Sequence, residues 1–283
     1  MSTVFLNGAL VNSGAARIDP ADRGLLLGDG LFETLRAYGG ALFRLDAHLA
    51  RLAAGAGAIA IPLPMAVAAL ADAVSATLRA NGLTDAGLRI TLTRGPGPRG
   101  LAPPPEPRPT LLITAVPYAG EGDTGAVRAC LAGAPRNEHS PSATLKTLGY
   151  LDNVLAAAEA RARGCDEAIL RNTAGRLAGG ARGNLFVVAG GALLTPPPRE
   201  GALPGIARAT VLELARGRGI EVRETPIDTA ALAAAAEAFL TNSLIEVLPL
   251  GSIDGRPVGD GGVGPLTAAL RAGYRKLAAA KRL

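Results

Sequence analysis

Lys146 is the residue whose type and position first point to chemistry. The chain has three lysines, and the other two, Lys276 and Lys281, lie in its last eight residues. Arginine supplies the rest of the 29 basic side chains. A guanidinium cannot replace lysine where a neutral primary amine must attack a carbonyl, because it stays charged at any working pH. A lone interior lysine therefore indicates a Schiff-base nucleophile; the alternative is a lysine left by chance on an exposed helix.

The length and composition fit a globular α/β protein. With 283 residues the chain is long enough for two domains, and 48% of its residues are hydrophobic while 3% are aromatic. The net charge of +5 is spread along the chain without basic–aromatic interleaving, which argues against a nucleic-acid partner. The N-terminus lacks the pattern of a secretion signal, and no uncharged apolar run reaches membrane-spanning length. We therefore expect a cytoplasmic protein without a membrane partner.

The sequence has few residues suited to metal binding or to serine-hydrolase catalysis. His48 and His139 are the only histidines, neither has a carboxylate cluster at ligand spacing, and His48 fits a packing or helix-surface position better than a ligand. Cys130 and Cys165 suggest neither a metal pair nor a disulfide framework. A Gly-x-Ser-x-Gly segment is missing, and two G-x-G-x-x-G matches, at 95–100 and 259–264, lack the strand and helix that a dinucleotide site needs. No metal site is predicted.

The elements that must position Lys146 follow from hydrophobic periodicity and turn residues. We expect hairpins at 4–11 and 31–44, and strands or helices at 46–56, 66–80, 88–93, 110–115, 127–132, 150–163, 167–171, 184–189, 192–195, 205–217, 220–224, 229–235, 237–242 and from 265 onward. Strands and helices mix without strict alternation, which predicts an α/β (α+β) protein with partly antiparallel sheets. The expected domains are a smaller one at 1–118, a linker at 119–124, and a larger one at 125–283 that carries Lys146.

Seven short motifs, in order, resemble those of class IV (fold type IV) pyridoxal-phosphate enzymes. They are Asp22-Arg23-Gly24, the segment from Gly28 to Thr34, the segment from His48 to Leu52, the segment from Leu145 to Ala156, Gly183-Asn184-Leu185-Phe186, the segment from Leu203 to Arg208, and Thr241-Asn242-Ser243. This family includes D-amino-acid and branched-chain aminotransferases and aminodeoxychorismate lyase. The resemblance implies two domains with pyridoxal 5'-phosphate (PLP) in the cleft between them, and a homodimer.

The resemblance also assigns roles to single residues. Lys146 would form a Schiff base with the cofactor aldehyde and later move protons, which requires a lowered pKa. The cofactor phosphate would be bound by Arg51, the Ser243 hydroxyl and the leading amides of a helix, at Ile206 and Ala207. Asn184 lies in the cofactor-binding segment of the family. Ala207 stands where threonine is frequent, so one side-chain donor is missing there.

Substrate contacts are implied for three further residues: Phe32, Arg99 and Asn242. Arg99 matches the arginine that D-amino-acid aminotransferases place against the substrate carboxylate, and such pairing fixes orientation as well as affinity. The histidine that accompanies it in that subfamily is replaced by Leu101. This departure weakens a strict D-amino-acid assignment.

Gly179 is the strongest departure from the family pattern. It stands where the family has a glutamate that pairs with the pyridine nitrogen of the cofactor, and without an anion there the ring accepts electrons less well. Arg182 could instead donate to an unprotonated ring nitrogen, or it could be a solvent-facing loop arginine. We expect an aminotransferase that moves an amino group between an amino acid, of D- or branched-chain type, and a 2-oxo acid. The alternatives are aminodeoxychorismate lyase, which forms p-aminobenzoate and pyruvate, and a weakly active PLP-binding homologue.

Overall fold

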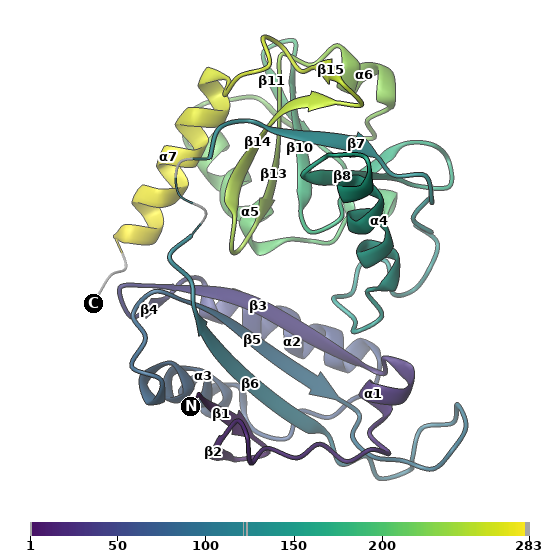
Figure 1. The fold of residues 1–283 in the computed structure, drawn as a ribbon, viewed down its shortest axis with the longest axis vertical. Helices are drawn as coiled ribbons and strands as arrows, with labels where there is room; N and C mark the ends of the chain where they lie inside the picture. Colours follow the sequence, from purple (N-terminus) through teal and green to yellow (C-terminus); the bar gives the residue numbers. More distant parts are fainter. Residues whose placement is uncertain (1, 121, 123, 281–283) are drawn as a thin grey trace. The chain divides into compact units, whose positions relative to one another are not determined.

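The computed structural model describes residues 2–120, 122 and 124–280, and it divides into two compact units (Figure 1). Unit 1 comprises Met1–Ala119, Leu145–Gly149 and Ala278–Leu283, and unit 2 comprises Gly120–Thr144 and Tyr150–Leu277. The chain thus passes from one unit to the other near residue 119, where the sequence predicts a linker.

Unit 1 is built on a six-stranded antiparallel sheet with strand order β2-β1-β6-β5-β3-β4. Its strands are β1 (Thr3–Leu6), β2 (Ala9–Asn12), β3 (Gly30–Tyr38), β4 (Ala41–Leu42), β5 (Ala86–Thr93) and β6 (Thr110–Pro117), and its helices are α1 (Arg23–Leu27), α2 (Leu45–Ala58) and α3 (Val67–Ala80). Asn7 and Gly8 form the two-residue turn between β1 and β2, both with positive φ, as a tight hairpin requires. The two expected hairpins are confirmed.

Helices α2 and α3 pack against the sheet and close the core of unit 1. Leu31 and Leu35 of β3, and Leu88 and Ile90 of β5, belong to the same buried cluster as apolar residues of both helices. Side chains alternate between the faces of a strand, so Glu33 shares the helix-covered face with Leu31 and Leu35. A carboxylate therefore stands on the core-facing side of this sheet.

The Leu145–Gly149 segment belongs to unit 1, although the sequence suggests that Lys146 lies in the C-terminal domain. It runs beside the start of β3, where Thr147 forms an antiparallel bridge with Leu31. The amide of Phe32 donates to the Lys146 carbonyl at 2.9 Å, and the Leu148 amide donates to the Gly30 carbonyl at 3.0 Å. These backbone hydrogen bonds attach the lysine segment to the N-terminal sheet.

Unit 2 contains a nine-stranded mixed sheet with strand order β12-β11-β10-β13-β14-β7-β8-β9, and β15 pairs with β14. The strands are β7 (Val127–Leu131), β8 (Glu167–Arg171), β9 (Leu177–Gly180), β10 (Asn184–Ala189), β11 (Ala192–Thr195), β12 (Val222–Glu224), β13 (Glu237–Asn242), β14 (Glu246–Ile253) and β15 (Arg256–Pro257). The helices are α4 (Leu151–Ala162), α5 (Ile206–Arg216), α6 (Thr229–Ala233), α7 (Pro265–Ala279) and the 3-10 turn η1 (Pro198–Glu200). One buried cluster joins β7, β10, β13 and β14, and a second lies between α4, β7 and β8.

The mixed α/β class and nearly all expected elements are confirmed. The sequence reasoning missed five elements: α1, β9, η1, β14 and β15. Strand β14 is the most instructive of them, because it is paired on both sides, by β13 and β7, although Pro249 stands in its middle. Among the described residues, no helix is long and apolar enough to cross a membrane.

Candidate active site

Lys146 carries a partly buried amine beside the ring of Phe32. Its Nζ lies 4.2 Å from the centroid of that ring, within the range of a cation–π contact. On the other strand of the pair, the Arg89 guanidinium carbon lies 3.8 Å from the same centroid. Phe32 and Arg89 both lie on the sheet face away from the α2–α3 core, as the alternation along β3 and β5 requires. Two cationic side chains thus share one aromatic ring.

The environment of Lys146 favours its neutral amine. Burial lowers the pKa of the Lys146 ammonium, and the positive charges of Arg51 and Arg89 lower it further, while the Glu33 carboxylate raises it. The result is a pKa of about 8, well below the ordinary value of 10.5. An amine with this pKa is available as a nucleophile and as a proton carrier near neutral pH. The lowered pKa that the sequence argument required is present in the structure.

Glu33 joins Arg51 and His48 in a buried cluster under α2. Arg51 donates from Nε to Oε1 and from Nη2 to Oε2 of Glu33, each at 2.7 Å, and His48 Nδ1 lies 2.7 Å from Oε2. The Glu33 and His48 side chains are 1% exposed, and Arg51 is 16% exposed. Burial raises the pKa of the Glu33 carboxyl, but the hydrogen bonds from Arg51 and His48 outweigh it, so that pKa lies below its usual value.

His48 is therefore a packed residue, as the sequence reasoning preferred, and its pKa is also lowered. Burial is the largest cause, and the charges of Arg51 and Lys146 act in the same direction, while Glu33 opposes them. The lowered pKa values of Glu33 and His48 both agree with a neutral His48 imidazole that donates from Nδ1 to an ionised Glu33 carboxylate. Among the described residues, no cluster of histidine, cysteine and carboxylate side chains could hold a metal ion.

In unit 2, the N-terminus of α5 is shaped for an anion. The N-cap residue, Gly205, offers no side-chain oxygen to the leading amides of the helix, and Ile206 and Ala207 are its first two residues. A Cβ at Gly205 would lie 2.0 Å from Oδ1 of Asn184, whose Nδ2 donates to the Leu203 carbonyl at 2.7 Å. A side chain at this point would displace the Asn184 amide, and with glycine here no side chain caps the end of the helix where its dipole favours negative charge.

Asn242 is the last residue of β13, and Ser243 begins the turn that leads to β14. The Asn242 side-chain oxygen accepts from the amides of Leu244 and Ile245, and its Nδ2 donates to the Arg182 carbonyl. The Asn242 side chain thus holds the turn that carries Ser243. Its predicted contact with substrate remains a prediction.

Gly179 has a backbone conformation that explains why a larger residue is absent. Its φ is +154°, and a Cβ built there would lie 3.1 Å from the Gly183 carbonyl oxygen. Side chains of L-residues rarely adopt such a φ. The backbone at Gly179 therefore disfavours any side chain, which the sequence could not show.

Arg99 lies in the exposed loop between β5 and β6. Arg23 fixes this loop by donating to the carbonyls of Gly100, Leu101 and Ala102 at 3.0, 2.9 and 3.3 Å. The structure does not bring Arg99 into the group formed by Phe32, Arg51 and Lys146. Its role toward a substrate carboxylate stays a prediction.

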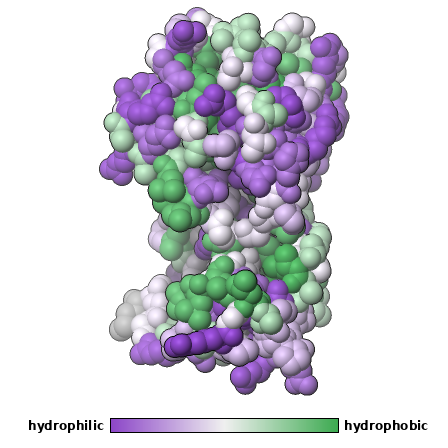
Figure 2. Space-filling view, turned by 90° about the vertical axis from the view of Figure 1, so that its right-hand side faces the viewer, coloured by the Kyte–Doolittle hydropathy of each residue, from purple (hydrophilic) through white to green (hydrophobic). Residues whose placement is uncertain are grey.

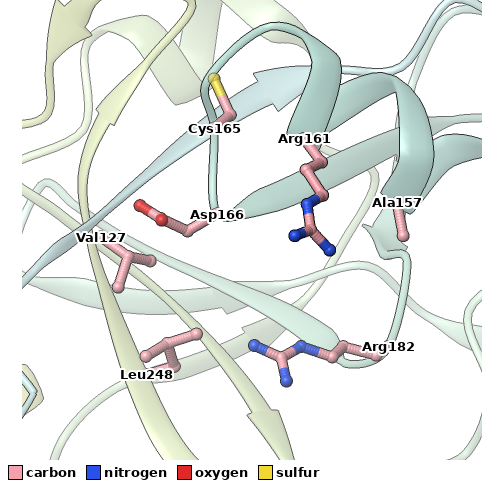
Figure 3. Close-up of a pocket in the computed structure, with 7 residues that line it drawn as sticks. All are labelled: Val127, Ala157, Arg161, Cys165, Asp166, Arg182 and Leu248. Atoms are coloured by element: carbon pink, nitrogen blue, oxygen red, sulfur yellow. The ribbon is translucent and has the colours of Figure 1, made fainter.

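Arg182, the sequence alternative for contact with the cofactor ring, is half-exposed and pairs with the buried Glu167 carboxylate. Its guanidinium also points into a pocket of about 460 Å³ in unit 2, into which Arg161 points as well (Figure 3). Val127 and Leu248 form an apolar side of this pocket. Apart from Arg182, no residue that the sequence reasoning considered for the cofactor or the substrate is among the residues that line this pocket.

The sequence reasoning found Lys146, Arg51 and Phe32, which the structure brings together, but it assigned no role to Glu33 or Arg89. One signal for Glu33 was available: it is the charged member of an alternating apolar series with Leu31 and Leu35. Arg89 gave no such signal, because an arginine on the open face of a strand is ordinary.

Comparison with known proteins identifies the family of the whole chain. The family model for amino-transferase class IV matches residues 30–253. The chain is 37% identical over 277 residues to the putative branched-chain-amino-acid aminotransferase of Methanocaldococcus jannaschii, covering 97% of this chain and 96% of that protein. It is 32% identical over 277 residues to the D-alanine aminotransferase of Staphylococcus haemolyticus, covering 98% of each. The crystal structure of the branched-chain aminotransferase from Thermoproteus uzoniensis with norvaline matches with a TM-score of 0.92 and 34% identity, over 99% of this chain and 95% of that one.

Proposed function

Because the chain belongs to the class IV aminotransferase family, we propose that it moves the amino group of a branched-chain L-amino acid to a 2-oxo acid, with PLP bound to Lys146. The observation that carries this proposal is the Lys146 amine, whose pKa of about 8 suits both attack on an aldehyde and proton transfer. The substrate class rests on the branched-chain relatives, which include the matched crystal structure.

The residues present fit PLP. The cofactor needs an amine for its aldehyde and amides and cations for its phosphate. Lys146 supplies the first, and the open N-terminus of α5 supplies bare amides where a Cβ at Gly205 would collide with Asn184. We propose that Arg51, Ile206, Ala207 and Ser243 bind the phosphate. Asn184 fixes the approach to α5 through its hydrogen bond to Leu203.

PLP, when bound, supplies an aldehyde that takes up the substrate amine and a conjugated ring that accepts electrons from the bond broken at the substrate Cα. The Lys146 Nζ takes the proton from that Cα and later returns a proton. It can do so because the amine is neutral in about half of the molecules near pH 8. Phe32 forms one wall beside the Nζ atom. Arg99 and Asn242 remain the proposed substrate contacts.

With Gly179 in place of a glutamate, no carboxylate at this position would stabilise a protonated ring nitrogen, and the cofactor ring would accept electrons less well. Arg182 is not a ready substitute, since its guanidinium pairs with Glu167. We propose that turnover is slow for this reason. Each tenfold loss in rate corresponds to about 1.4 kcal/mol of barrier.

We propose that the protein acts as a homodimer in the cytoplasm. Leu151, Val154 and Leu155 of α4 are 58–67% exposed and lie at helical spacing on one side of that helix. Leu25, Leu26 and Leu27 of α1 are 49–69% exposed. On the face that Figure 2 shows, apolar residues (green) lie together in patches. Such clusters are typical of surfaces that a second subunit covers.

A substrate comparison tests the proposal. Purified protein with added PLP is incubated with 2-oxoglutarate and either L-leucine or D-alanine, and formation of the new 2-oxo acid is followed. We expect transfer from L-leucine and little or none from D-alanine. Preference for D-alanine would overturn the substrate class and would favour the D-alanine aminotransferase relatives, in agreement with the role that the resemblance implies for Arg99. Transfer from neither donor would overturn the proposed activity.

A further inference from the structure

Glu33 is an unusual residue for the face of β3 that it occupies. Its neighbours on that face, Leu31 and Leu35, are 2% and 0% exposed and belong to the core under α2. Moving a carboxylate out of water into such surroundings costs free energy unless the charge is paired. A valine or leucine would satisfy packing alone at this position. The carboxylate therefore calls for an explanation beyond packing.

Both oxygens of the Glu33 carboxylate are used. Oε1 accepts from Nε of Arg51, and Oε2 accepts from Nη2 of Arg51 and from the His48 imidazole, all at 2.7 Å. Paired hydrogen bonds of this kind fix the plane of the guanidinium as well as its distance. His48 and Arg51 stand three residues apart on α2, so one carboxylate fastens one face of that helix to β3.

We propose that Glu33 is a positioning residue for amino transfer. Its carboxylate, which also binds His48, holds the Arg51 guanidinium through two hydrogen bonds. It thereby fixes where the positive charge of Arg51 lies near the Lys146 amine and offsets part of that charge. The inference deepens the proposed function and rests on it, since Lys146 and Arg51 are the groups that would meet the cofactor.

The charges around Lys146 give this role a measurable sign. Arg51 from α2 and Arg89 from β5 lower the pKa of the Lys146 ammonium, and Glu33 from β3 raises it. His48 contributes no charge while its imidazole is neutral. Removing the Glu33 charge should therefore lower the pKa of Lys146 below about 8. Removing the Arg51 charge should raise it.

The test measures the titration of Lys146 directly in the full-length protein freed of cofactor. Competitive acylation with isotopically labelled acetic anhydride, read by mass spectrometry of the Lys146 peptide, gives the pH midpoint of its amine. With three lysines in the chain, the Lys146 peptide is easily separated from the others. The variants are Glu33→Gln, Arg51→Gln and the double variant, and Glu33→Asp keeps the charge.

We expect the midpoint to fall on the order of one pH unit in Glu33→Gln, to rise by a similar amount in Arg51→Gln, and to return near the native value in the double variant and in Glu33→Asp. Glu200→Gln is the matched control. It also removes the charge of a buried carboxylate paired with an arginine, Arg176, but in unit 2. It should lower the melting temperature without moving the Lys146 midpoint.

A Lys146 midpoint in Glu33→Gln that stays at the native value, or that rises, would overturn the inference and leave Glu33 a structural residue. If Glu33→Gln does not fold, the other two variants still decide. A Lys146 midpoint that is unchanged in Arg51→Gln, or that moves away from the native value in Glu33→Asp, contradicts the proposed effect of these charges on Lys146. A chain that binds no PLP would end the proposed function, yet the Lys146 titration would still be read. The two failures are thus distinguishable.

Discussion

The Arg51 guanidinium meets the Glu33 carboxylate through two parallel hydrogen bonds, both 2.7 Å long. The pair is neutral as a whole, and it stands beside the lysine with the lowered pKa. The Arg51 side chain is 16% exposed, whereas the Glu33 side chain is 1% exposed. A residue that the resemblance assigns to phosphate binding is thereby held in place before any phosphate arrives. Such preorganisation reduces the cost of binding.

Uptake of PLP by the cofactor-free protein should depend on pH through Lys146. The neutral amine is the form that attacks an aldehyde, and its fraction rises as pH increases through about 8. We expect the initial rate of uptake, followed by absorbance near 420 nm in stopped flow, to increase tenfold from about pH 6 to pH 7 and to level off above about pH 9. A rate that keeps rising toward pH 10.5 would show an ordinary lysine.

Replacing Gly205 with alanine should weaken cofactor binding. The new Cβ would collide with Oδ1 of Asn184, so Asn184 must release the Leu203 carbonyl and the N-terminus of α5 must shift. We expect the dissociation constant for PLP to rise about tenfold, or ~1.4 kcal/mol, in equilibrium dialysis. Gly125→Ala is the control, because nothing lies within 4 Å of its Cβ position. Equal affinity in the two variants would count against the role of α5.

Introducing a glutamate at Gly179 should not simply restore the family's carboxylate. The φ of +154° and the 3.1 Å approach to the Gly183 carbonyl strain any side chain there. We expect Gly179→Glu to lose about 1–3 kcal/mol in urea unfolding, with Gly125→Glu as the unstrained comparison. A Gly179→Glu protein of native stability with faster turnover would show that the backbone at this position adapts freely.

Asp22 should be a major source of stability in unit 1. It is fully buried and accepts from the hydroxyls of Thr93 and Thr110 and from the Gly24 amide, at 2.7–2.9 Å. Asp22→Ala leaves these donors without a partner, and we expect a loss of about 2–4 kcal/mol in the free energy of unfolding. The exposed Asp19, which accepts one hydrogen bond from Ala21, gives the control variant Asp19→Ala. A change within about 0.5 kcal/mol in both would contradict this assignment.

Most elements could be predicted because their patterns are local. The Asn7-Gly8 turn and the alternation along β3 and β5 indicate their own structure. Strand β14 could not be predicted, since its proline argues against a strand and its pairing with β7 and β13 is long-range. The placement of Leu145–Gly149 in unit 1 depends likewise on hydrogen bonds to residues more than 100 positions away.

The site was predictable where chemistry restricts the residue type. Lys146 was identified because arginine cannot replace its amine, and Arg51 through the family motif. Glu33 was not assigned a role, because its alternation with Leu31 and Leu35 indicates the core-facing side of β3 but does not reveal its partners, Arg51 and His48. The conformation of Gly179 was also out of reach, since glycine is abundant in this chain and its φ follows from the fold.

The central claim, that Lys146 is the amine that holds the cofactor, is tested most directly by borohydride reduction. Protein supplemented with PLP is treated with sodium borohydride and digested, and the peptides are examined by mass spectrometry. The account predicts a phosphopyridoxyl group on the peptide that contains Lys146, and none on the peptides of Lys276 or Lys281. A Lys146 peptide recovered without the group, from protein that had been saturated with PLP, would contradict it.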